Sequence, residues 1–175
     1  MQHLDFKDNF FILLSLPVGF QVDLQQLEQN FRALQAQVHP DKFSHLPEAE
    51  RRVSMQWSTR VNEAYQTLRK PIDRARYLLS LQGVDTQEET NTAMPMDFLM
   101  QQMEWRESIE AAKTSAQLEA LLAELNQEMN RLQQQLALAI DDQHDYLAAA
   151  GIVRKLKFFE KLAEEIDASF DLIDY

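Results

Sequence analysis

Apolar residues in the first half of the chain recur at intervals of three and four, which is the spacing of an amphipathic helix. The longest such stripe is Leu24, Leu27, Phe31, Leu34 and Val38. Glu28, Arg32 and several glutamines occupy the other face, and Asp23 precedes the stripe as a suitable N-cap. Pro40 biases His39 away from the helical conformation. The pattern therefore predicts a helix that begins after Asp23 and ends before Pro40.

Three further stretches of the N-terminal half carry helix signals. The stretch NFFILLSLP predicts a short helix that ends before Pro17. Pro47 suits the first turn of another helix, and Pro71 opens a third whose C-cap is Gly83. The apolar stripe of the helix after Pro47 is Val53, Trp57, Val61, Ala64, Tyr65 and Leu68. We expect this helix to pair antiparallel with the one before Pro40, because each has one apolar stripe and the connection is short.

The second half of the chain has the pattern of a helical bundle. Residues 84–96 lack an apolar period and predict a linker. Two later segments carry heptad seams. One seam is Leu118, Leu122, Leu125, Met129, Leu132, Leu136 and Ala139, and the other is Ile152, Leu156, Phe159, Ala163, Ile166, Phe170 and Ile173. With a third helix at residues 97–113, the fold class is all-α: an N-terminal domain at residues 1–83 and an antiparallel three-helix bundle at residues 97–175.

Composition agrees with an all-helical protein and excludes several functional classes. The 175 residues include only 3 glycines and 5 prolines. The formal net charge of -11 has the wrong sign for a nucleic-acid binder or for an anionic membrane surface. The absence of cysteine excludes disulfides and thiolate metal ligands. We also find no glycine-rich phosphate loop and no apolar run of roughly 18 residues, so we expect neither an ATP-hydrolysing enzyme nor a membrane span.

The stretch VHPDKF lies on the short connection between the two paired helices. His39, Pro40 and Asp41 can simply end one helix and turn the chain, or they can be a loop that a partner recognises. Composition alone leaves both interpretations open. A metal site formed with His45 is disfavoured by the intervening proline, and no serine or cysteine accompanies His39 as a nucleophile.

The N-terminal segment from about Phe10 to Gln82 resembles a J-domain. It has the short first helix, an amphipathic helix that ends in HPDK, an antiparallel helix with NEAYQTL, and a fourth helix. The stretches RKPIDRARYLLSLQG, FLMQQMEWRE and VRKLKFFEKL are similar to the HscB family, the J-domain co-chaperones of iron-sulfur cluster assembly. The resemblance covers nearly the full chain. It implies a J-domain formed by a helical hairpin and two short helices, followed by a three-helix bundle.

The resemblance implies two protein partners and no cofactor. The first is an ATP-dependent heat-shock chaperone of the HscA type, whose ATPase the family stimulates through the tripeptide that maps onto His39, Pro40 and Asp41. Pro40 fixes the backbone and leaves the Asp41 carboxylate free to compete for an arginine or a polar network of the chaperone. Family members have a basic face on the second helix, whereas here only Arg32 is basic between Asp23 and His39. We therefore expect Arg32 and Lys42, with the ERR stretch at residues 50–52, to supply the docking charge.

The second implied partner is a cluster scaffold protein of the IscU type. At about 100° per residue, Phe98, Trp105 and Ile109 share the face that the bundle buries, while Met100 and Met103 project from a different side. This second apolar face must be covered by a partner or by other parts of the chain, and the residues alone leave that choice open. By resemblance, the scaffold-binding residues are Leu99, Met100, Met103, Glu104, Glu107 and Phe158. A further acidic position of some relatives is Ala111 here.

Two function hypotheses follow. The first is a co-chaperone adaptor that is monomeric alone and binds neither nucleic acid nor membrane. Its first helix begins almost at once, whereas mitochondrial relatives carry an N-terminal extension, so we expect a bacterial cytoplasmic protein. The alternative is a structural helical adaptor that self-associates through its methionine face and has no effect on a chaperone.

Overall fold

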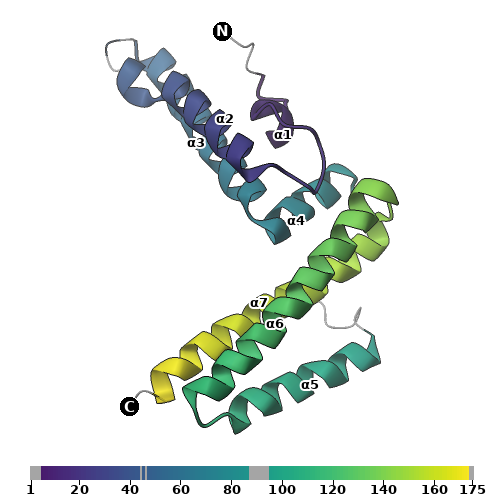
Figure 1. Ribbon diagram of the computed structural model, residues 1–175. Helices are drawn as coiled ribbons and strands as arrows, with labels where there is room; N and C mark the ends of the chain where they lie inside the picture. Colours follow the sequence, from purple (N-terminus) through teal and green to yellow (C-terminus); the bar gives the residue numbers. More distant parts are fainter. Residues whose placement is uncertain (1–4, 44, 46, 87–94, 174–175) are drawn as a thin grey trace. The chain divides into compact units, whose positions relative to one another are not determined.

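A computed structural model describes residues 5–43, 45, 47–86 and 95–173. All regular structure in these residues is helical, as the sequence predicts (Figure 1). The chain divides into two compact units, Met1–Leu78 and Leu79–Tyr175. The predicted linker at residues 84–96 lies largely outside the described residues. Among the helices of the described part, none is long and apolar enough to cross a bilayer.

The first unit is built on an antiparallel hairpin of α2 (Leu24–Val38) and α3 (Glu48–Arg69) (Figure 1). Asp23 caps α2 as predicted, because its side chain accepts hydrogen bonds from the backbone N–H groups of Gln25 and Gln26 at 2.9 and 3.0 Å. The short helix α1 (Phe10–Leu13) packs on α3. The buried residues of the hairpin are Leu27, Leu34, Val38, Trp57, Val61, Ala64 and Leu68.

For two residues of the hairpin, the prediction that they belong to the core is wrong. Leu24 is 56% exposed and Val53 is 47% exposed. Leu24 is the first residue of α2, directly after its N-cap Asp23. On α3 the buried stripe continues from Trp57 to Ser54 rather than to Val53, so a small polar residue occupies the core position nearest the end of α2.

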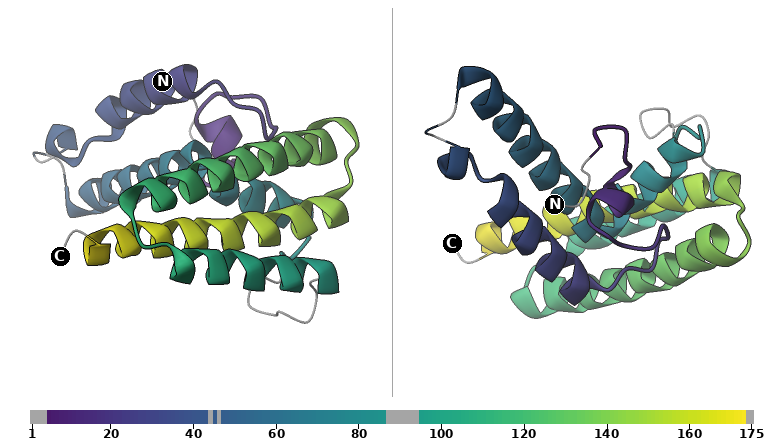
Figure 2. Two further views of the ribbon diagram at one scale, coloured as in Figure 1. Left: turned by 60° about the horizontal axis from the view of Figure 1, so that its bottom comes forward. Right: turned by 90° about the horizontal axis from the view of Figure 1, so that it is seen from above.

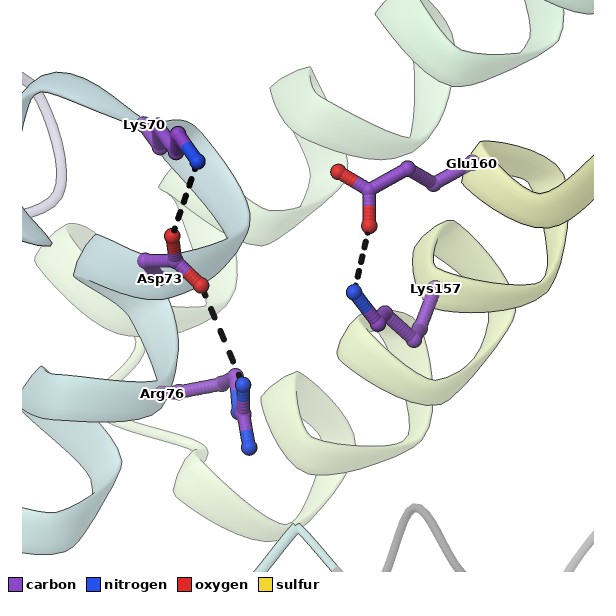
Figure 3. Close-up of polar contacts among 5 residues, drawn as sticks. All are labelled: Lys70, Asp73, Arg76, Lys157 and Glu160. Carbon is purple, nitrogen blue, oxygen red and sulfur yellow. Dashed lines mark hydrogen bonds and ion pairs between the residues drawn. The ribbon is translucent and has the colours of Figure 1, made fainter. Parts of the chain in front are cut away.

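Arg74 ties the ends of three segments of the first unit together. It lies on α4 (Pro71–Leu81), is 6% exposed, and donates from Nε to the Phe20 carbonyl at 2.7 Å and from Nη1 to the Leu68 carbonyl at 2.6 Å. The guanidinium also lies 4.9 Å from the centre of the Phe20 ring. On the same helix the Asp73 carboxylate lies 3.9 Å from Lys70 Nζ and 3.8 Å from Arg76 Nη1 (Figure 3).

Past the end of α4, Gly83 has a φ of 71°, a conformation that favours glycine. Its N–H donates to the carbonyl of Ser80 at 3.0 Å. The prediction that Gly83 terminates this helix is confirmed in its essentials, since the helix ends two residues earlier, at Leu81.

The second unit is a bundle of α5 (Met96–Ala111), α6 (Ser115–Ala137) and α7 (Tyr146–Ile173), which lie side by side (Figures 1 and 2). A π-helical turn, η3 (Leu138–Asp142), continues α6 toward α7. Thr114 caps α6 by accepting from the N–H of Gln117 at 3.3 Å. The predicted three-helix bundle is confirmed.

The predicted seam of α7 is only partly correct. Leu156, Phe159 and Ile166 are buried, whereas Ile152, Ala163 and Phe170 are half-buried, and the side chain of Ile173 lies outside what the structure describes. Residues off the seam are buried as well, namely Ala149, Val153 and Leu162. Because α7 packs against both α5 and α6, its buried face is wider than the stripe of a two-stranded coiled coil.

Candidate functional site

The His-Pro-Asp tripeptide forms a hydrogen-bonded turn at the end of α2. The helix ends at Val38, and His39 has extended dihedral angles, φ −60° and ψ 127°. Pro40 then starts the 3₁₀ turn η1 (Pro40–Phe43), in which the N–H of Lys42 donates to the His39 carbonyl at 3.1 Å. Pro40 therefore ends the helix as predicted, and the turn that follows is hydrogen-bonded.

The side chains of the tripeptide differ in what they contact. The imidazole Nδ1 of His39 accepts from the backbone N–H of Asp41 at 3.3 Å and lies 3.6 Å from Asp41 Oδ2. The Asp41 side chain is 91% exposed. The turn therefore holds the backbone of Asp41 while its carboxylate faces solvent, which is the geometry required of a group read by a partner.

The predicted docking cation Arg32 is already paired within the first unit. Its Nε lies 2.7 Å from Glu28 Oε1 on the same helix, and Glu28 also accepts a hydrogen bond from the Tyr65 hydroxyl of α3. The Tyr65 hydrogen bond first, and the Arg32 hydrogen bond second, hold the pKa of Glu28 below its usual value, while the same bond raises the pKa of Tyr65. Glu28 therefore stays ionised at neutral pH and retains Arg32.

The other predicted cations also differ in their availability. Lys42 is exposed beside Asp41, and within the described residues it forms no ion pair. Arg52, in contrast, is paired with Glu48 at 2.9 Å. Among the predicted docking cations, Lys42 thus lies next to the tripeptide and forms no ion pair within the described residues.

One residue beside the tripeptide was missed by the sequence analysis. Ser54 on α3 is buried, and its hydroxyl donates to the Val38 carbonyl, the last carbonyl of α2, at 2.8 Å. A serine inside a helix carries no sequence signal for such a contact, because the acceptor lies 16 residues away in the chain.

The second candidate surface lies on the bundle and is here called the methionine face. It consists of Leu99, Met100, Met103, Glu104, Glu107 and Phe158. Met100 and Met103 are 59% and 64% exposed, and both glutamates are exposed. The described bundle therefore leaves more than half of each of these two methionines exposed. Ala111, the last residue of α5, is exposed and supplies no carboxylate.

Phe158, the member of the methionine face that α7 supplies, also contacts the bundle core. It is half-buried, and its ring meets the edge of Phe98 at 5.6 Å between centroids, with the Arg106 guanidinium 5.7 Å from its centre. The neighbouring Lys157 pairs with Glu160 at 2.6 Å (Figure 3). Phe158 thus both packs on α5 and presents part of its ring.

A hollow of about 410 Å³ overlaps the methionine face at Met100 and Glu104. Asp97, Phe98, Met100, Gln101, Glu104 and Lys155 line it. Lys155 Nζ lies 5.4 Å from the centre of the Phe98 ring. The hollow offers an aromatic base between charges of both signs, and such a site suits an apolar side chain with polar neighbours.

Comparisons with known proteins cover both units. The family model described as the DnaJ domain matches residues 9–77, and the model described as the HSCB C-terminal oligomerisation domain matches residues 94–167. A co-chaperone protein HscB homolog from Aromatoleum aromaticum is 48% identical over 174 residues, covering 98% of each chain. The structure of chaperone HscB from Vibrio cholerae is 39% identical with a TM-score of 0.85, covering 95% of this chain and 99% of that chain. The crystal structure of human co-chaperone protein HscB is 31% identical with a TM-score of 0.91, covering 96% and 85% respectively.

Proposed function

Because this chain belongs to the HscB family of J-domain co-chaperones, which serve iron-sulfur cluster assembly, we propose that it stimulates ATP hydrolysis by an HscA-type chaperone and delivers an IscU-type scaffold to it. Its relatives are named co-chaperones rather than enzymes, and a J-domain works with an Hsp70-type chaperone. The proposal places this work in the bacterial cytoplasm.

The first part of this proposal, activation of the chaperone, rests on one observation. The Asp41 carboxylate is exposed on a hydrogen-bonded turn. A carboxylate held in this way can accept paired hydrogen bonds from an arginine of the chaperone, and little side-chain and no backbone freedom is lost when it does so. Lys42 beside it adds a charge that steers the encounter with an acidic surface. The decisive experiment is the steady-state ATPase rate of the HscA-type chaperone with and without this protein.

The scaffold-binding half rests on the exposure of the methionine face. Met100 and Met103 are exposed on the bundle. Methionine side chains are flexible and polarisable, so they can adapt to a partner surface. Glu104 and Glu107 form an acidic border and favour a partner with basic residues around an apolar centre. The face and the tripeptide belong to different units, so one unit can hold the scaffold while the other acts on the chaperone.

Met103→Ala combined with Phe158→Ala is expected to weaken scaffold binding at least tenfold, about 1.4 kcal/mol, because it removes two apolar contact groups. Titration calorimetry with an IscU-type scaffold measures this change. Met96→Ala is the matched control, since Met96 is 73% exposed at the start of α5 and lies outside the methionine face.

The same double variant should stimulate the chaperone normally when no scaffold is present. Circular dichroism must show an intact bundle, because Phe158 also packs on Phe98. Unchanged scaffold affinity in a folded double variant would remove the methionine face from the proposal.

Glu28→Gln is expected to strengthen chaperone docking. Glutamine still accepts from the Tyr65 hydroxyl but no longer holds Arg32 by charge, so Arg32 becomes available to the chaperone. We expect the half-saturating concentration for ATPase stimulation to fall about twofold at low salt, and the gain to vanish at high salt. Adding Arg32→Gln should cancel the gain. If Arg32→Gln alone has no effect and Glu28→Gln brings no gain, Arg32 is not a docking residue.

Self-association is the second candidate role of the methionine face. The exposure of Met100 and Met103 favours it, as does the description of the matching family model as an oligomerisation domain. Sedimentation velocity separates the two roles. The co-chaperone proposal predicts a monomer of 20.4 kDa, whereas a dimer that Met103→Ala dissociates would assign the face to self-association.

A further inference from the structure

The hydroxyl of Ser54 does not make the hydrogen bond that helical hydroxyls usually make. Elsewhere in the described helices, Thr59, Ser108 and Ser169 each donate to the carbonyl four residues earlier in their own helix, at 3.0, 2.8 and 2.8 Å. Ser54 instead donates across the hairpin to the Val38 carbonyl of α2 at 2.8 Å, and it is only 5% exposed. Its hydroxyl therefore links the two helices.

The Val38 carbonyl needs an external donor. It is the last carbonyl of α2, and the last four carbonyls of a helix have no donor within the helix. His39 leaves the helix in an extended conformation, so no left-handed cap supplies an N–H. Because Val38 is itself 5% exposed, solvent has little access to this group. Ser54 satisfies a buried carbonyl at the point where the helix gives way to the tripeptide.

This bond holds the peptide plane at which the chain leaves α2. The Val38 carbonyl and the N and Cα atoms of His39 lie in one peptide plane, so a donor that fixes the oxygen also fixes the plane from which His39 starts. From His39 onward the turn is hydrogen-bonded internally, since its carbonyl accepts from the N–H of Lys42 at 3.1 Å and its Nδ1 from the N–H of Asp41 at 3.3 Å. The orientation set at Val38 thus passes to Asp41 through a hydrogen-bonded turn.

We propose that Ser54 is a positioning residue for the tripeptide: its hydrogen bond to Val38 sets where the Asp41 carboxylate is presented to the chaperone. This inference rests on the proposed chaperone-activating function. Ser54 itself touches no partner, because it is buried in the hairpin.

Removing the hydroxyl should therefore lower the stimulated rate rather than docking. In Ser54→Ala the hairpin core is intact, but the end of α2 samples several orientations and Asp41 is correctly placed for only part of the time. We expect the maximal ATPase stimulation to fall about fivefold, in proportion to that fraction. The half-saturating concentration should change less than twofold, because Arg32 and Lys42 are unaltered.

The experiment compares the full-length chain, Ser54→Ala and Ser58→Ala in ATPase titrations of an HscA-type chaperone. The temperature is chosen so that circular dichroism shows every variant folded. Ser58 is the matched control, since it lies one turn further along α3 and no hydrogen bond joins it to α2 among the described residues. A second readout is the imidazole NMR signal of His39, with that of His144 in the other unit as the internal reference.

The expected result is a lower maximal stimulation and a displaced or broadened His39 signal in Ser54→Ala alone. Full stimulation with an unchanged His39 signal and only a lower melting temperature would make Ser54 a stability residue and overturn the proposal. An equal loss in Ser58→Ala would also overturn it. If the native chain fails to stimulate, the proposed function fails, and the His39 signal still decides whether Ser54 positions the turn.

Discussion

Asp41→Asn is expected to abolish stimulation of the chaperone ATPase while the free energy of unfolding stays within about 0.5 kcal/mol of the native value. Asparagine has the same size, and the hydrogen bond from the residue 41 backbone to His39 Nδ1 does not involve the side chain. The Asp41 side chain, which also lies 3.6 Å from His39 Nδ1, is 91% exposed, and contacts of such exposed groups contribute little to stability. The missing charge is then the only change that a chaperone arginine detects.

The measurement is steady-state ATP turnover at fixed salt, with urea denaturation of the same samples. Asp23→Asn is the matched control, because it makes the same chemical change at an exposed residue that only caps α2, and asparagine caps as well as aspartate. The control should retain both stability and stimulation. Full stimulation by Asp41→Asn would mean that the tripeptide only ends α2 and turns the chain. The structural adaptor would then be the better interpretation.

The ends of the helices around the tripeptide were predictable because their causes are local. Pro40 excludes a helical His39 through its own ring, and the Asp23 side chain reaches only two and three residues ahead. The three-helix bundle was predictable for a similar reason, since heptad spacing along one segment is enough to define a buried face. The exposure of Met100 and Met103 could not be read from the sequence, which left two candidates for what covers them.

Features that depend on packing between segments were missed or misassigned. The internal partners of Arg32 were missed, because Glu28, which holds it, also accepts a hydrogen bond from Tyr65 of the other helix; the docking role of Arg32 stays a prediction. Ser54 gave no signal because its acceptor lies on α2. The face of α7 was predicted too narrow because periodicity describes one contact, whereas α7 packs on two helices.

Arg74 is the strongest case, because a charged residue in a helix is normally predicted to be exposed. Arg74→Met is expected to lower the free energy of unfolding of the first unit by about 3 kcal/mol. Methionine fills the space of the aliphatic stem but leaves the carbonyls of Phe20 and Leu68 without the donors they now have at 2.7 and 2.6 Å. Both bonds are buried, and each unsatisfied buried acceptor costs about 1 to 3 kcal/mol. The relief of burying one less charge offsets part of the loss, which keeps the expected value at the lower end of that sum.

The measurement must report the first unit alone. The chain has 2 tryptophans, Trp57 in the first unit and Trp105 in the second, so a Trp105→Phe background makes the fluorescence of Trp57 specific for the J-domain. Urea denaturation in this background compares Arg74→Met with Arg76→Met, where Arg76 is 47% exposed and lies 3.8 Å from Asp73 on the same helix. The control should lose less than about 1 kcal/mol, as expected for an exposed ion pair. Equal losses in the two variants would mean that the buried guanidinium does not hold the ends of these segments together. A large loss confined to Arg74→Met would show that the J-domain, and with it the tripeptide, depends on a buried cation.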